Sequence, residues 1–119
     1  MQAGSRLHRK IQKRMGTSYR SEVMLRHQVQ EDMFDILVEG RADGIITEPA
    51  GVTIDEIKCI YMDVSRLEEP DPVHLAQALC YGWFYSTQNE LETIGIQITY
   101  CNIETEEIRR FKEAGALRS

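Results

Sequence analysis

The sequence predicts an α+β domain built on a central mixed sheet of four strands flanked by helices. Patterns typical of helices occur in three places along the 119 residues, and patterns typical of strands occur in four. The first three strand patterns follow one another, which favours antiparallel pairing. A helix separates the third from the fourth, which favours a parallel crossover. The predicted order is therefore α-β-β-β-α-β-α, in a single domain.

The first predicted helix covers residues 5–15 and has one apolar face, whereas its remaining faces are basic. Its apolar positions, spaced at i, i+4 and i+8, are Leu7, Ile11 and Met15. The first 20 residues carry six basic and no acidic side chains, whereas the rest of the chain carries eight basic and 19 acidic ones. This segregation favours a protein that contacts a phosphate backbone with one element and metal ions with another. A solvated helix face explains the basic segment equally well.

Three strands are predicted next, at residues 19–29, 33–46 and 52–61. The first two are predicted to form a hairpin through residues 30–32. A turn from Pro49 to Gly51 leads into the third.

The second predicted helix begins at Pro72, with Asp71 as its N-cap. Its predicted core face consists of Val73, Ala76, Cys80 and Trp83. The opposite face carries a polar and aromatic stripe, formed by His74, Gln77, Tyr81 and Tyr85. The last strand is predicted at residues 93–101. A final helix is predicted at residues 104–113, where acidic residues come first and basic residues last, as the helix dipole favours.

Composition excludes several classes of protein. No run approaches the ~18 consecutive apolar residues of a membrane span, and the basic start lacks the apolar region of a secretory signal. We therefore expect a cytoplasmic location and no membrane partner. The three cysteines, Cys59, Cys80 and Cys101, are isolated and form no C-x-x-C motif. They are predicted to be reduced thiols and not disulfide, zinc or iron–sulfur ligands.

Charged residues near the end of the third strand form the candidate site. Glu56 and Lys58 share one face of a strand, whereas Asp55 and Ile57 point to the other. If the preceding strand ends nearby, Asp43 adds a second carboxylate. Two carboxylates beside a fixed cation suit a hard metal ion next to a group that stabilises negative charge. Taken alone, an acid-x-lysine triplet occurs by chance in most proteins of this size.

Four motifs occur in order on these elements: Gly4-x-x-x-His8, Asp43 within Gly-Arg-Ala-Asp-Gly, Glu56-Ile-Lys58, and Gln77-x-x-x-Tyr81. With these motifs, residues 4–81 resemble the PD-(D/E)XK nuclease superfamily, and within it the RecB-like branch. The resemblance implies a restriction-endonuclease-like fold. It also implies a metal-dependent deoxyribonuclease that hydrolyses phosphodiester bonds in DNA repair or processing.

The resemblance implies a role for each of these residues. The implied ligands of Mg²⁺ or Mn²⁺ are His8, Asp43, Glu56 and the main-chain carbonyl of Ile57. Oxygen ligands suit Mg²⁺, and an imidazole increases the tolerance for Mn²⁺. Lys58 would orient or deprotonate the attacking water and stabilise the transition-state charge. Gln77 and Tyr81 would position Lys58 and the scissile phosphate, or contact the DNA strand.

The chain departs from the family pattern at Ala42, which stands where the superfamily's name has proline. It also lacks the four cysteines that bind an iron–sulfur cluster in CRISPR-associated relatives. The motifs look most like the nuclease domain of some bacterial DinG/XPD-type helicases, so we expect a fragment of a larger protein. A helicase domain on the same or another chain is a candidate partner, since no Walker motif is present.

Two other functions are consistent with the sequence. One is a catalytically silent nucleic-acid-binding module of a helicase assembly, and the other is an unrelated small α/β enzyme with a fortuitous acid-x-lysine triplet. His74 could contact nucleic acid and Glu22 could reach a second metal ion, but exposed surface positions explain both. The sequence leaves open the strandedness of the DNA, endonucleolytic or exonucleolytic cleavage, and a homo-oligomer.

Overall fold

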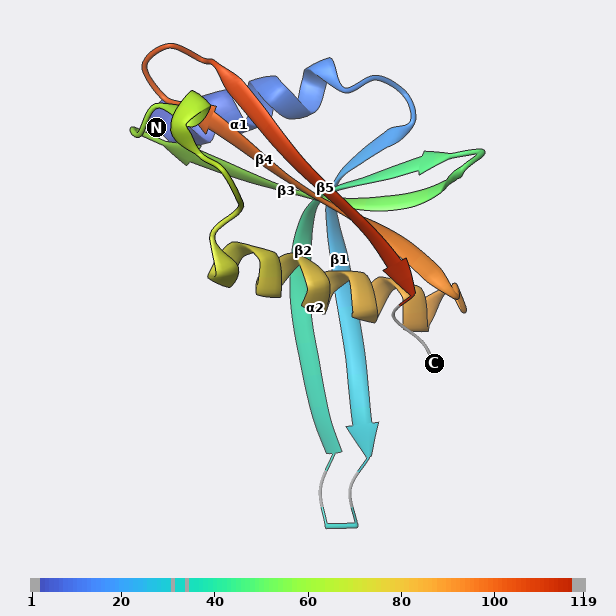
Figure 1. The fold of residues 1–119 in the computed structure, drawn as a ribbon. Helices are drawn as coiled ribbons and strands as arrows, with labels where there is room; N and C mark the ends of the chain where they lie inside the picture. The colour runs from blue at the N-terminus through green and yellow to red at the C-terminus, as the bar shows by residue number, and fades with distance from the viewer. Residues whose placement is uncertain (1–2, 31, 34, 117–119) are drawn as a thin grey trace.

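The computed structural model describes residues 3–30, 32–33 and 35–116. They form a mixed α+β fold, a five-stranded sheet with two α-helices and one short 3-10 helix (Figure 1). In chain order the elements are α1 (Ala3–Arg14), β1 (Tyr19–Gln30), β2 (Asp35–Glu48), β3 (Gly51–Ile60), η1 (Val64–Arg66), α2 (Pro72–Gln88), β4 (Thr93–Asn102) and β5 (Ile108–Ala116). No helix in this part of the chain is long and apolar enough to cross a membrane.

The strands lie in the sheet in the order in which they occur in the chain. Neighbouring strands are antiparallel except β3 and β4, which are parallel and are joined through α2. The predicted antiparallel start and parallel crossover are therefore confirmed. Figure 1 shows α1 and α2 on opposite faces of the sheet, and each covers its own apolar cluster.

The predicted C-terminal helix is wrong, and with it the count of four strands. Residues 108–116 form β5, which pairs antiparallel with β4, so that Phe111 lies opposite Ile98. The side chain of Asn102 accepts hydrogen bonds from the amides of Glu104 (2.8 Å) and Thr105 (2.9 Å) and so holds the turn between these strands. Pairing with β5 satisfies the backbone groups at the edge of β4, which a helix would leave without partners.

The predicted start of α2 is confirmed, because the Asp71 carboxylate accepts a hydrogen bond from the amide of Val73 at 2.8 Å. The predicted core face is wrong: Val73 is 74% exposed and Trp83 is 38% exposed. The helix instead buries small residues at i, i+4 and i+8, together with Phe84; they are Ala78, Gly82 and Ser86. Small residues allow the helix backbone to lie close to the sheet, so the polar and aromatic stripe is half-buried beside them.

The hairpin of β1 and β2 changes faces at Glu22 and Asp43. Beyond this point Leu25 and Ala42 lie in the core under α2. Before it, Tyr19 lies on the α1 face, where its hydroxyl contacts Asp55. The pairing of the two strands is interrupted at residues 22 and 43, and Glu22 has a left-handed φ of 54°. Figure 1 shows the far half of the hairpin extending away from the sheet, past α2.

Candidate functional site

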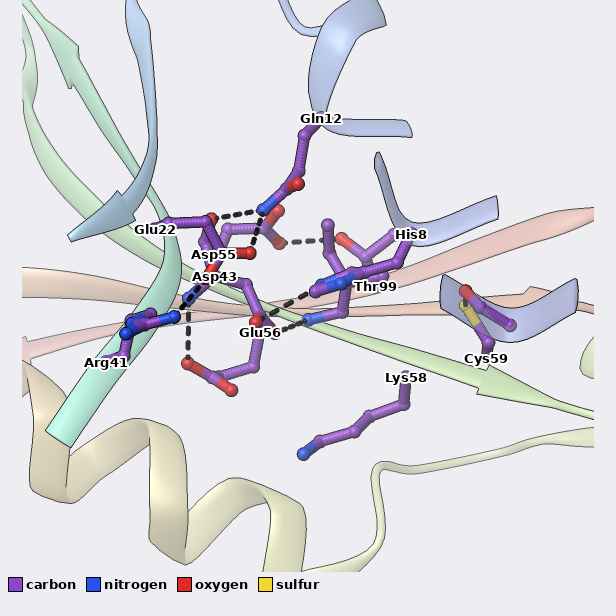
Figure 2. Close-up of polar contacts among 12 residues, drawn as sticks. His8, Gln12, Glu22, Arg41, Asp43, Asp55, Glu56, Lys58, Cys59 and Thr99 are labelled. Carbon is purple, nitrogen blue, oxygen red and sulfur yellow. Dashed lines mark hydrogen bonds and ion pairs between the residues drawn. The ribbon is translucent and has the colours of Figure 1, made fainter. Parts of the chain in front are cut away.

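The point at which the hairpin changes faces lies next to α1 and the middle of β3. Side chains from α1, β1 and β2 converge there: His8, Glu22 and Asp43 each offer a ligand atom, and these atoms lie within 4.8 Å of one another (Figure 2). A surface cavity of about 270 Å³ opens beside them and is lined in part by His8 and Ile57. The cluster is therefore accessible to a small ion.

His8 and Asp43 face each other without forming an aligned hydrogen bond. The distance from His8 Nε2 to Asp43 Oδ1 is 3.2 Å, yet this buried nitrogen has no hydrogen-bond partner of acceptable geometry among the described residues. The Asp43 carboxylate nevertheless raises the pKa of His8 against the opposing effect of burial. His8 Nε2 and Asp43 Oδ1 therefore both remain available as ligand atoms for a cation between them.

Backbone and amide contacts fix the acidic members of the cluster. Asp43 Oδ2 accepts a hydrogen bond from the amide of Ile57 at 2.7 Å, so the carboxylate lies directly against the backbone of β3. Gln12 Nε2 donates to Glu22 Oε1 at 3.0 Å and to the carbonyl of Asp43 at 2.8 Å. Gln12 lies one helical turn after His8, so one face of α1 supplies both side chains.

Glu56 points to the α2 face of β3, opposite to the face covered by α1, and lies beside the backbone of Asp43. Its side chain is 2% exposed, and its Oε1 lies 3.5 Å from the Asp43 amide nitrogen. Burial, followed by the nearby Asp43 carboxylate, raises the pKa of Glu56 to about 8, although Lys58 opposes this change. A buried carboxyl with so high a pKa lacks a sufficient positive partner, and a divalent cation would supply one.

Lys58 is held on the same face of β3 as Glu56. Its Nζ donates a hydrogen bond to Gln77 Oε1 at 2.8 Å, and Gln77 Nε2 in turn lies 3.4 Å from the Tyr81 hydroxyl. Tyr81 also packs over Gly40, where an added Cβ would lie 2.5 Å from its ring. The half-buried stripe of α2 thus orients the ammonium group of Lys58, on the opposite side of β3 from His8 (Figure 2).

The donor set fits a hard divalent cation. Carboxylate oxygens with one imidazole suit Mg²⁺ and more particularly Mn²⁺. The lack of an aligned hydrogen bond at His8 Nε2 and the raised pKa of Glu56 are both features that a bound cation would relieve. Cys59 lies near His8 in the same cavity, and burial raises the pKa of its thiol.

The residues predicted for the site fall into two groups, one on each side of β3: His8 and Asp43 lie with α1, and Lys58, Gln77 and Tyr81 lie with α2. His8 and Asp43 are brought together, while Glu56 lies beside the Asp43 backbone. Glu22 completes the three-residue cluster, and its side chain is exposed, as the sequence predicted. Gln12 was not predicted; its only sequence signal is its position four residues after His8 on the same helix.

A second polar group, also absent from the sequence prediction, lies buried under α1. Asp55 is fully buried and points away from Glu56, as the strand alternation predicts. Its carboxylate accepts hydrogen bonds from the hydroxyls of Tyr19 and Thr99, both at 2.7 Å, and from Gln97 Nε2 at 3.0 Å. These bonds tie β1, β3 and β4 together directly behind the candidate site.

The chain matches no family model and no curated protein. Its fold is similar to the crystal structure of SSO0001, with a TM-score of 0.68 and 21% sequence identity. The match covers 97% of this chain and 52% of that one, so this chain spans about half the length of SSO0001. At this identity the likeness concerns the fold alone.

Proposed function

We propose that this protein is a metal-dependent deoxyribonuclease of the PD-(D/E)XK type, with Mg²⁺ or Mn²⁺ as its cofactor. The observation that carries the proposal is the position of Asp43. Its carboxylate faces His8 Nε2 at 3.2 Å and is fixed by the Ile57 amide, while Glu56 lies beside its backbone and Lys58 shares the face of Glu56. Carboxylates, an imidazole and an oriented ammonium group suit phosphodiester hydrolysis.

The side chains divide into two groups by their chemistry. Asp43, Glu22 and His8 would hold the cation, with Glu56 supplying a further carboxylate, and the bound cation would neutralise charge on the phosphate and its leaving group. Lys58, which Gln77 keeps in one orientation, would orient the attacking water and stabilise the charge that develops on the phosphoryl oxygens.

The charge distribution supports DNA as the substrate. The helix that carries His8 also presents exposed basic side chains, at Arg6, Lys13 and Arg14 among others. Basic side chains attract the phosphate backbone without reading its sequence, and binding through them weakens steeply as salt rises. Because α1 contributes both this basic surface and His8, DNA bound along it would lie next to the cation cluster.

Cleavage assays with matched lysine variants test the proposal. Labelled single-stranded and double-stranded DNA is incubated with the protein in Mn²⁺, Mg²⁺ or EDTA. We expect cleavage that requires the metal ion and falls by about 100-fold in Lys58→Ala. The control is Lys112→Ala, which removes an exposed lysine of β5 and should cleave like the wild type.

Equal cleavage by wild type and Lys58→Ala would overturn the proposed chemistry. Salt-sensitive DNA binding with no turnover in either metal would instead support the catalytically silent binding module. A protein that neither binds DNA nor responds to divalent cations would leave the unrelated α/β enzyme as the remaining explanation.

A further inference from the structure

A second cavity lies on the α2 face of the sheet. Its volume is about 480 Å³, which lies within the range of about 300–1,000 Å³ of small-molecule pockets. It is formed where β3 ends and α2 begins. Its walls include Ile60, Leu67 and Pro72, and the polar side chains of His74 and Tyr100 also line it.

Two of the residues that line this cavity, Ile60 and His74, are near neighbours of Lys58 and Gln77 on the same elements. Ile60 lies two residues after Lys58 and so shares its face of β3. His74 lies three residues before Gln77 and is its neighbour on the surface of α2. The Lys58 ammonium is one cause, after burial, of the lowered pKa of His74.

Hydrogen bonds in the cavity indicate which ring nitrogen of His74 can bind a ligand. The Tyr100 hydroxyl accepts a hydrogen bond from the Asp71 amide at 2.9 Å and lies 2.7 Å from His74 Nδ1. The Tyr100 hydroxyl can donate its own proton to His74 Nδ1, which is the acceptor nearby among the described contacts. This arrangement fits a neutral imidazole that carries its proton on Nε2. The Nε2–H group, which has no hydrogen-bond partner among the described residues, can then donate to a ligand.

The charge of the lining excludes a phosphate. None of the described lining residues is Lys or Arg, and two of them, Glu69 and Asp71, are acidic. The rest of the lining is largely apolar, with polar groups at His74 and at the hydroxyls of Tyr100 and Tyr61, and the ring of Tyr61 is exposed, since this residue is 70% exposed. A flat, neutral heteroaromatic group with a hydrogen-bond acceptor on its edge matches these features.

We propose that this cavity, the base pocket, binds one nucleobase of the DNA strand whose neighbouring phosphate lies at Lys58. The inference rests on the proposed function, since it assumes that Lys58 contacts a phosphate. The base pocket excludes charge while Lys58 attracts it, so the two sites bind different parts of one nucleotide unit. A base that enters the pocket must be unpaired, at least locally, from its complementary strand.

An abasic scan tests the base pocket separately from catalysis. A set of oligonucleotides, each lacking one base at a different position, is bound to the protein in Ca²⁺, and the same set is cleaved in Mn²⁺. We expect one abasic position, next to the cleaved phosphate, to weaken binding about tenfold, as the loss of one stacked base does. Abasic sites elsewhere should have less effect.

Two variants in the pocket, with one control variant, test whether the loss of binding at the abasic position depends on the cavity. Leu67→Trp fills the pocket and should abolish the position dependence, while Leu79→Trp places the same side chain on the partly exposed outer side of α2 and should preserve it. His74→Phe keeps a ring but removes both nitrogens, and should reduce the effect without filling the pocket. Retention of the position dependence in both Leu67→Trp and His74→Phe would overturn the inference.

The outcomes also separate this inference from the proposed function. Metal-dependent cleavage with an equal effect at every abasic position would overturn the base pocket alone, and would favour an apolar side chain of a protein partner as its occupant. Failure of the wild type to bind any oligonucleotide would overturn both proposals. Binding with the expected position dependence but no cleavage would support the pocket and contradict the nuclease.

Discussion

Asp43 occupies a position that a regular strand would not provide. Opposite it, Glu22 adopts a left-handed backbone conformation at φ 54°, which costs a residue with a side chain roughly 1–2 kcal/mol. The change of faces at these two residues lets the Asp43 carboxylate reach both the Ile57 amide and His8 on α1. Backbone strain at a cluster of ligand-type side chains is consistent with a functional role for that cluster.

Gln77 is expected to act on the reaction through Lys58. Gln77→Leu preserves the approximate size of the side chain but removes the acceptor at 2.8 Å from Lys58 Nζ, so the ammonium group loses its fixed orientation. A hydrogen bond to a charged group contributes about 1.5–3 kcal/mol, and we expect kcat to fall about tenfold or more with KM little changed. Steady-state cleavage kinetics measure both.

The matched control for this prediction is Gln28→Leu, at an exposed position of β1. It should leave both constants unchanged. A rise in KM with constant kcat in Gln77→Leu would show that Gln77 binds the DNA and does not position Lys58.

Gly44 is expected to tolerate no side chain. A Cβ at this position would lie 1.9 Å from Tyr19 Cζ, so Gly44→Ala must displace the tyrosine that donates to buried Asp55. We expect a loss of about 3 kcal/mol in the free energy of unfolding, from overpacking and the broken hydrogen bond. Denaturant titration measures this loss.

Gly4→Ala provides the contrasting substitution, since its added Cβ would meet its nearest neighbour at 3.8 Å. Within α1 this change should stabilise the protein by up to about 1 kcal/mol, because alanine favours helix formation more than glycine does. Equal stability of the two variants would contradict the close contact between Gly44 and Tyr19.

At the scale of the elements, α2 shows why a hydrophobic pattern can select the wrong face. Val73 and Trp83 lie on its most apolar stripe, but the helix packs through Ala78, Gly82 and Ser86. Close approach to the sheet requires small residues, and their modest hydrophobicity is a weak sequence signal. Trp83 instead packs at the surface against the His27 ring, with their centroids 4.4 Å apart.

Two adjacent aromatic residues test this orientation of α2. Phe84 is 6% exposed and Trp83 is 38% exposed, so Phe84→Ala should cost about 3–4 kcal/mol in the free energy of unfolding and Trp83→Ala less than half of that. Chemical denaturation of both variants measures the difference. The reverse order would support the face that the sequence pattern favours.

Other elements were predictable to different degrees for equally physical reasons. The alternating pattern located β1 to β4 within a few residues, and Asp71 followed by Pro72 located the start of α2, because these signals are local. Residues 108–116 form a strand and not a helix because they pair with the open edge of β4, and this edge exists only in the tertiary structure. The motif residues could be assigned to one site, but the role of Glu22 depends on a change of strand faces that no local pattern records.

At the scale of the molecule, the candidate site joins the two layers that cover the sheet. His8 comes from α1 on one face, and Gln77 comes from α2 on the other, while Asp43 and Glu56 lie on the strands between them. The cation cluster and the lysine are therefore fixed by separate helices. The buried Asp55 network behind them ties together three of the strands.

Divalent cations are expected to reverse the stability order of the wild type and Asp43→Asn. Without metal, Asp43 lies beside the Glu22 carboxylate and raises the pKa of buried Glu56, so neutralising Asp43 should stabilise the fold. With Mn²⁺ at about 100 times its dissociation constant, binding to the folded state should add about 2.7 kcal/mol to the wild type, or roughly 10 °C in Tm. Asp43→Asn should gain little stability from Mn²⁺, because it lacks the central carboxylate. It should still fold, because the asparagine oxygen can accept the hydrogen bond from the Ile57 amide.

Thermal unfolding with EDTA and with Mn²⁺ measures the four values. The control is Asp35→Asn, at an exposed position of β2, which should shift with Mn²⁺ as the wild type does. An equal Mn²⁺ shift in wild type and Asp43→Asn would show that the cation binds elsewhere, and no shift in either would exclude an assembled cation site.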